Sequence, residues 1–165
     1  QMKHWGKKSG RRGRNSAYIR TKTGAVPLVQ NNRKNHRTMF KDILLVGVGS
    51  FVGGSLRMVI SKYVQLAIVG SFPLGTMVVN VLGCFLIGIF ASLPSDNGGI
   101  SPAVRLLLTT GFCGGFTTFS TFMNENVGII KGGDGFTTSA LYVFASLALG
   151  FLAVLAGRQL VISLR

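Results

Sequence analysis

The sequence predicts an all-α membrane protein with four transmembrane helices, the third of which is broken. Only 13 % of the residues are charged and the mean hydropathy is +0.44, whereas soluble domains carry roughly 25 % charged residues. Four apolar segments are long enough to cross a bilayer, which takes about 20 residues. The chain also has 23 glycines, a residue that is tolerated better in packed membrane helices than in soluble ones.

The N-terminal extension, residues 1–38, differs from the rest because it is basic, contains no Asp or Glu and has no sustained apolar period. This composition predicts disorder. Three explanations stay open: binding to nucleic acid or anionic lipid, an organelle transit peptide, or a misassigned reading frame upstream of a true start at Met39. We favour the third, because apolar periodicity begins directly after Met39. The four-helix domain is then residues 39–165.

The first predicted span covers about residues 43–63. Gly49 and Gly53 form a GxxxG pair, which lets another helix approach closely. Arg57 lies toward the far end of this span, where an arginine either snorkels to the interface or makes a vestibule electropositive. Position alone favours the interfacial arginine.

The second predicted span covers about residues 73–93, with Pro73 suited to its first turn. Asn80 is an isolated carboxamide near mid-span. Its NH2 group can donate to an anion, or it can join two helices, which is the commoner case. Thr76 lies one turn earlier on the same face, and two polar residues on one face make a pore lining more plausible.

The third predicted span, about residues 103–130, contains the stretch GFCGGFTTFSTF at Gly111–Phe122. Adjacent glycines are poor helix formers, and hydroxyl side chains can satisfy the backbone groups that a break frees. An irregular stretch in lipid survives only if protein buries it or it lines a cavity. The competing interpretation, a helix softened by Ser and Thr with no function, has about equal weight. The hydroxyl residues are Thr117, Thr118, Ser120 and Thr121.

The fourth predicted span covers about residues 136–164. Tyr142, Ser146 and Gly150 are spaced by four and form one stripe, which is either a helix-packing contact or a polar track. At the end of the third span, Glu125 continues the face of Phe119 and Phe122. The alternative for Glu125 is a carboxylate that reaches interfacial water.

Basic residues are distributed almost evenly over the two sides of this four-span topology. An even number of spans puts both termini on one side, and the Lys/Arg bias orients membrane proteins. Near-balance makes insertion in both orientations, and so an antiparallel dimer, physically possible, whereas the basic extension would hold the termini in the cytoplasm. From Met39 onward the terminal side carries Lys41, Arg105, Arg158 and Arg165, and the opposite side carries Arg57, Lys62 and Lys131.

Three stretches of this sequence resemble the CrcB/Fluc fluoride channel family: GGSLR at Gly53–Arg57, PLGTMVVNVLGCFLIG at Pro73–Gly88, and Gly111–Phe122 followed by Glu125. The resemblance covers about Met39–Arg165. It implies an antiparallel dual-topology homodimer in the cell inner (plasma) membrane. Such a dimer has two pores for passive export of cytoplasmic fluoride, which confers fluoride resistance.

The resemblance also implies roles for individual residues. Asn80 would coordinate fluoride, Phe119 and Phe122 would present ring edges to the ion, and Ser120 and Thr121 would add hydroxyl donors. Gly150 departs from the family pattern, which often has a hydroxyl there. The remaining implied roles are a polar track of Tyr142 and Ser146, pore ends at Glu125 and Arg57, and a structural Na+ held by the carbonyls of Gly114 and Thr117 from both subunits.

Other classes of protein fit the sequence less well. A small exporter of cationic drugs needs a carboxylate within the membrane, and the candidates, Asp42 and Glu125, lie near span ends. A nucleic-acid-binding module would depend on the basic extension, and we expect no nucleic-acid partner. An enzyme is not favoured, because His4 and His36 lie in the extension and the spans hold no nucleophile–base pair.

Overall fold

A computed structural model describes residues 18–21, 24–27, 32–67, 72–94, 99–133 and 135–164, with side chains from Thr38 onward. The chain divides into two compact units, residues 1–39 and 40–165. In the first unit, β1 (Tyr18–Thr21) and β2 (Gly24–Pro27) pair as an antiparallel hairpin. Most of the extension for which disorder is predicted lies outside the described residues.

Three long apolar helices follow: α1 (Asn32–Ala67), α2 (Leu74–Ser92) and α6 (Gly135–Ser163). Within the described parts of the chain, these three are long and apolar enough to cross a membrane, α1 from Thr38 onward. They correspond to the predicted first, second and fourth spans, although α1 begins earlier than expected. Large apolar side chains such as Phe51, Phe144 and Phe151 are exposed on α1 and α6, as expected of surfaces that face lipid.

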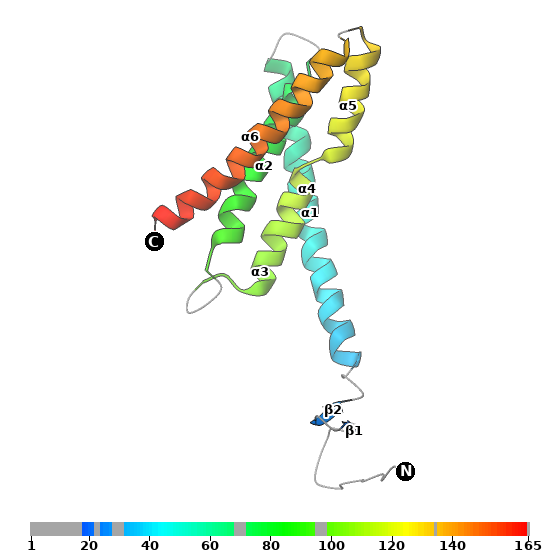
Figure 1. The fold of residues 1–165 in the computed structure, drawn as a ribbon, viewed down its shortest axis with the longest axis vertical. Helices are drawn as coiled ribbons and strands as arrows, with labels where there is room; N and C mark the ends of the chain where they lie inside the picture. The colour runs from blue at the N-terminus through cyan, green and yellow to red at the C-terminus, as the bar shows by residue number, and fades with distance from the viewer. Residues whose placement is uncertain are drawn as a thin grey trace. The chain divides into compact units, whose positions relative to one another are not determined.

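The third apolar segment consists of α3 (Pro102–Leu106), the π-helix η1 (Leu107–Cys113), α4 (Gly114–Phe116) and α5 (Phe119–Lys131). Figure 1 shows that the helical course is interrupted between α4 and α5. Two extended residues separate α4 from α5: Thr117 (φ −87°, ψ 157°) and Thr118 (φ −146°, ψ 117°). The break predicted between residues 111 and 122 is therefore confirmed.

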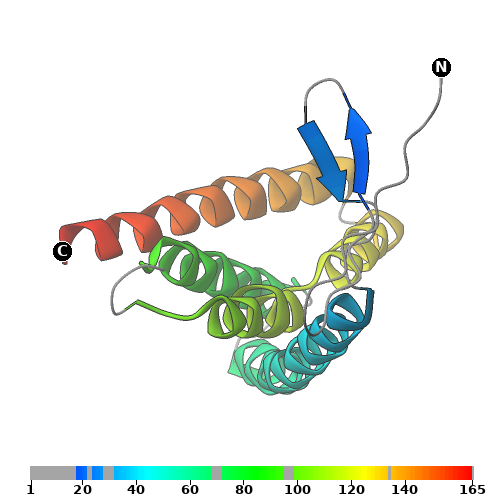
Figure 2. The same cartoon turned by 90° about the horizontal axis from the view of Figure 1, so that it is seen from below.

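The helices of residues 40–165 pack through glycines that allow close backbone approach. A Cβ on Gly49 would lie 2.6 Å from the Leu107 carbonyl oxygen, and one on Gly115 would lie 2.5 Å from that of Ser50, so α1 touches the η1–α4 segment with no room for a side chain. In the same way Gly157 of α6 sits against the backbone of α2. Seen from below, α2 lies between α6 and the α3–η1 segment (Figure 2).

The apolar core lies where α5 meets α6. It consists of Phe122, Ile129 and Tyr142, packed by Phe72, Met77 and Val143. The rings of Phe122 and Tyr142 have centroids 4.9 Å apart. This contact connects the segment just after the break to the N-terminal third of α6.

Candidate functional site

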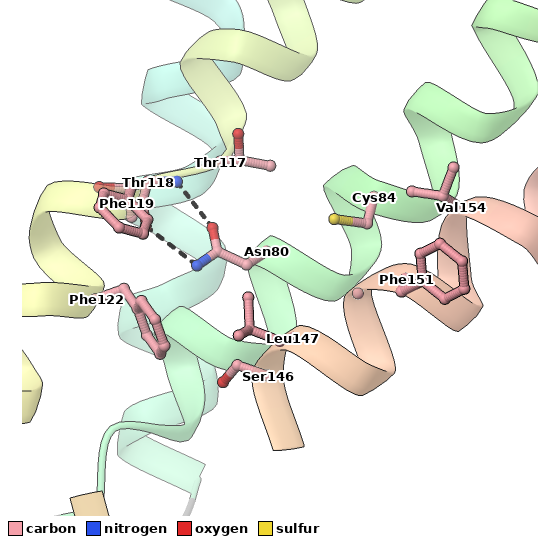
Figure 3. A pocket seen from close by; sticks show the side chains of 11 residues that line it. Asn80, Cys84, Thr117, Thr118, Phe119, Phe122, Ser146, Leu147, Phe151 and Val154 are labelled. Atoms are coloured by element: carbon pink, nitrogen blue, oxygen red, sulfur yellow. Dashed lines mark hydrogen bonds between the residues drawn. The ribbon is translucent and has the colours of Figure 1, made fainter. Parts of the chain in front are cut away.

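A cavity of about 340 Å³ lies where the helix break faces α2 and α6 (Figure 3). It brings together Asn80 from α2, Phe119 and Phe122 from α5, and Ser146 from α6, four of the residues that the sequence singled out. Its remaining lining is Cys84, Thr117, Thr118, Leu147, Gly150, Phe151 and Val154. Among these described residues none carries a formal charge, so the cavity is polar only through dipoles.

Asn80 bridges α2 to the break. Its Oδ1 accepts from the Thr118 backbone N–H (2.8 Å), and its Nδ2 donates to the Thr118 carbonyl (3.1 Å). A helix break in lipid must satisfy its freed backbone groups, and this side chain satisfies both groups of one residue. Because a carboxamide NH2 has two donor hydrogens, the second remains for a group in the cavity.

The threonines at the break explain why α5 begins where it does. Thr118 is the N-cap of α5, since its Oγ1 accepts from the Thr121 backbone N–H (3.3 Å), the usual role of a capping hydroxyl. Thr117 ends α4, with its N–H and its Oγ1 both donating to the Cys113 carbonyl (3.0 Å each). A Cβ on Gly83 would collide with the Thr117 methyl group, so α2 can approach the break only because Gly83 is small.

Ser146 supplies a second polar group to the cavity. Its Oγ is buried and has no hydrogen-bond partner among the described residues. A buried hydroxyl without a partner costs free energy, which makes Ser146 a site where a ligand atom would be stabilising. Phe122 is 4 % exposed and Phe119 is 71 % exposed, so one ring belongs to the core and the other lies at the open side.

Ser120 and Thr121, expected as hydroxyl donors, lie on the first turn of α5 but are not among the lining residues of the cavity. Ser120 is exposed, and Thr121 accepts at its Oγ1 from the Thr118 hydroxyl (3.0 Å). Cys84 was not singled out as a site residue, although its position one turn after Asn80 puts it on the same face. A Cβ on Gly150 would lie 3.3 Å from the Cys84 sulfur. The thiol therefore lies next to the position that a side chain at residue 150 would occupy.

Glu125 and Arg57, the predicted pore-end charges, line a second cavity of about 580 Å³. Glu125 Oε1 accepts from Thr76 Oγ1 (2.6 Å), and Oε2 lies 3.0 Å from the Tyr142 hydroxyl. Tyr142 is 1 % exposed and its hydroxyl also lies 3.2 Å from the Pro73 carbonyl. Tyr142 therefore belongs to the Glu125 cluster and not to the lining of the first cavity, which contains Ser146.

The break also frees backbone carbonyls. In a continuous α-helix the Thr118 N–H would donate to Gly114, and the Thr121 N–H to Thr117; here they donate to Asn80 Oδ1 and Thr118 Oγ1. The Gly115 carbonyl accepts from Arg57 Nε (3.3 Å). No cluster of three His, Cys, Asp or Glu exists in the described part of the chain, so a cation held there would depend on such carbonyls.

These features are those of a multi-pass helical membrane protein with a small, uncharged cavity at a helix break, where a few polar groups lie among mostly apolar side chains. The family model described as "CrcB-like protein, Camphor Resistance (CrcB)" matches residues 44–158, and the chain belongs to this family.

Curated relatives agree with the family assignment. The chain is 45 % identical to the "Fluoride-specific ion channel FluC" of Chlorobium phaeobacteroides (strain BS1) over 118 residues, which is 72 % of this chain and 91 % of the relative. It is 46 % identical to the protein of the same name from Chlorobaculum tepidum over 122 residues, covering 74 % and 95 % of the two chains. The protein of that name from Prosthecochloris aestuarii is 46 % identical over 121 residues, covering 73 % and 93 %.

Proposed function

We propose that this chain is a fluoride-selective ion channel of the cell membrane, which lets cytoplasmic fluoride leave passively and so lowers its toxicity. The observation that carries the proposal is the cavity in which the spare Asn80 donor, the unpaired Ser146 hydroxyl and three phenyl rings meet without a charged side chain. The names of the relatives and the family match support the same function. The protein is a channel and not an enzyme.

The chemistry of the cavity suits a small anion. Fluoride holds its water strongly, so a pore must replace that hydration shell with close donors, yet bind weakly enough for the ion to leave. Asn80 and Ser146 supply N–H and O–H donors, and aromatic ring edges carry positive quadrupole density that can face an anion. A fixed cation would trap the ion, and the described lining of the cavity includes none.

The ion path continues toward Glu125 and Arg57. In this proposal Tyr142 passes the ion between the Ser146 cavity and the Glu125 end, while Ser120 and Thr121 add hydroxyls from the first turn of α5. The Arg57 and Lys62 side chains line the cavity at that end, and clustered positive charge raises the local concentration of anions.

We further propose that two copies assemble as an antiparallel, dual-topology homodimer with two pores, each copy crossing the membrane four times. The break supports this assembly, because Ser120 and Phe119 are exposed in mid-segment. A hydroxyl facing lipid is costly unless protein covers it. A second, inverted copy would bring the same break against this one and close the open side of the cavity.

A structural Na+ at the dimer centre fits the residues present. The carbonyls of Gly114 and Thr117 are released from their helical donors by Asn80 and Thr118. Carbonyl oxygens are the hard, neutral ligands that such a cation prefers. Two carbonyls from each copy would supply four ligands and hold the two breaks together without adding a charged side chain to the pores.

Replacement of one ring tests the proposed pore. Phe119→Ile keeps apolar bulk but removes the aromatic edge, so we expect fluoride efflux from proteoliposomes to be abolished while the dimer persists in detergent. Phe144→Ile is the matched control, because Phe144 is also 71 % exposed but lies on α6 outside the cavity lining. Undiminished fluoride efflux in Phe119→Ile would show that the Phe119 ring is not part of the ion path.

A further inference from the structure

A second pair of buried polar side chains lies one helical turn beyond the cavity. Ser139 Oγ of α6 donates to Asn126 Oδ1 of α5 (2.8 Å), and Asn126 Nδ2 donates back to the Phe122 carbonyl (2.8 Å). Asn126 is 6 % exposed and Ser139 is 5 % exposed. The fluoride path described above uses neither residue.

The pair belongs to a regular ladder between α5 and α6. Asn126 follows Phe122 by four residues, and Tyr142 follows Ser139 by three, so each pair shares one face of its helix. The two helices run in opposite directions, and their contacts in order are Asn126 with Ser139 and then Phe122 with Tyr142. The next residue on that face of α6 is Ser146, which lines the cavity beside Phe122.

Apolar contacts alone specify such a register weakly. Phe122 and Ile129 are apolar and can repack after a small slide, since cores tolerate hydrophobic rearrangement. The Tyr142 hydroxyl, 3.0 Å from Glu125 Oε2, is one polar contact between α6 and α5, and the Asn126–Ser139 pair is another. The Asn126–Ser139 hydrogen bond resists a slide, because a shift would leave the buried Asn126 Oδ1 without its donor, the Ser139 hydroxyl. Fully satisfied buried polar pairs specify one arrangement for this reason.

We infer that Asn126 and Ser139 are positioning residues that set the register of α5 on α6 and thereby the spacing between the Phe122 ring and the Ser146 hydroxyl across the ion cavity. Asn126 is suited to this role because its hydrogen bond to the Phe122 carbonyl ties the pair to the residue that forms the cavity wall. The spacing of donors and ring edges decides which halide can replace its water shell. The pair thus tunes halide selectivity without touching the ion, an inference that rests on the proposed fluoride channel.

The test is the ratio of fluoride to chloride efflux from proteoliposomes that contain the full chain. We expect Ser139→Ala to lower this ratio about tenfold, the scale of one lost buried hydrogen bond. Ser139→Thr keeps the hydroxyl and should keep the wild-type ratio. The double variant Asn126→Leu/Ser139→Ala leaves no unpaired polar group, so its dimer should be as stable as wild type while its ratio stays low.

A matched control makes the corresponding changes, Asn to Leu and a hydroxyl residue to Ala, at exposed positions of the two helices, as Asn124→Leu/Thr137→Ala, and should behave as wild type. A wild-type ratio in the double variant would overturn the positioning role. Failure of Ser139→Ala and of the double variant to fold, while the control folds, would overturn it too, because the pair would then be a folding requirement. If the wild-type protein itself passes no fluoride, the proposed channel function fails instead, which separates the two outcomes.

Discussion

The substitution Asn80→Asp tests the ion cavity most directly, because it replaces the side-chain amide with a carboxylate and hardly changes the volume of the side chain. The new carboxylate still accepts from the Thr118 N–H, now as a charge-assisted hydrogen bond, so the break keeps its main support. It loses the donor to the Thr118 carbonyl, 3.1 Å away, and it has no N–H left for an anion. The variant should fold and dimerise but should not conduct.

The size of the effect follows from the electrostatics. A unit negative charge about 4 Å from an anion costs about 4 kcal/mol at an effective dielectric constant of 20. Since 1.4 kcal/mol is about a factor of ten, occupancy of the cavity by fluoride should fall by about three orders of magnitude. The lining offers no described cation to offset the added charge.

Fluoride efflux from proteoliposomes, followed with a fluoride electrode, measures this loss directly. Asn124→Asp is the matched control, because Asn124 is exposed and lies outside the cavity lining; it adds the same charge and should leave efflux near the wild-type rate. Efflux in Asn80→Asp within a few-fold of wild type, from a properly assembled dimer, would refute the assignment of Asn80 to the ion path.

Three further predictions concern the cavity and its supports. Ser146→Ala should lower fluoride efflux by about tenfold without lowering thermal stability, because hydrogen bonds to charged groups contribute about 1.5–3 kcal/mol and this hydroxyl has no described protein partner. A drop in stability with normal efflux would contradict this prediction. Gly83→Ala should destabilise the detergent-solubilised protein by about 1–3 kcal/mol, because the new methyl group is overpacked against Thr117. Gly128→Ala is the control and should be tolerated, because nothing lies within 4 Å of its new Cβ. Equal melting temperatures for the two variants would contradict the close contact at Gly83. Arg105→Met removes the hydrogen bonds to the carbonyls of Ala91 and Leu93 at the end of α2. It should lower the free energy of unfolding by about 1–3 kcal/mol and leave the fluoride-to-chloride selectivity unchanged. Altered selectivity would contradict a purely structural role for Arg105.

The sequence predicted the long apolar helices and the break in the third segment, because these depend on local properties, but it predicted neither the β1–β2 hairpin nor the π-helix η1. Apolar length identified α1, α2 and α6 as spans, and the adjacent glycines and hydroxyls predicted the break that the structure places at Thr117 and Thr118. The gathering of Asn80, Phe119, Phe122 and Ser146 around one cavity was predicted only through the family resemblance. Helical spacing shows which residues share a face but not which face of another helix they meet.

The partners of polar side chains could not be read from the chain for the same reason. Glu125 was expected near a pore end, yet nothing local indicates that it accepts hydrogen bonds from both Thr76 and Tyr142. Thr118, counted only as one more hydroxyl, turns out to be both the α5 N-cap and the partner of Asn80. Asn126 and Ser139 each follow two other polar residues in the sequence, and only their contact across α5 and α6 distinguishes them from those neighbours.

The most direct test of the central claim is the efflux of fluoride and of chloride from proteoliposomes that contain the purified full-length chain, measured side by side. We expect rapid loss of fluoride and chloride leakage no faster than from protein-free vesicles, because fluoride is the small anion whose tightly held water the Asn80 and Ser146 donors would replace. Equal efflux of the two halides, or none of either, would contradict it.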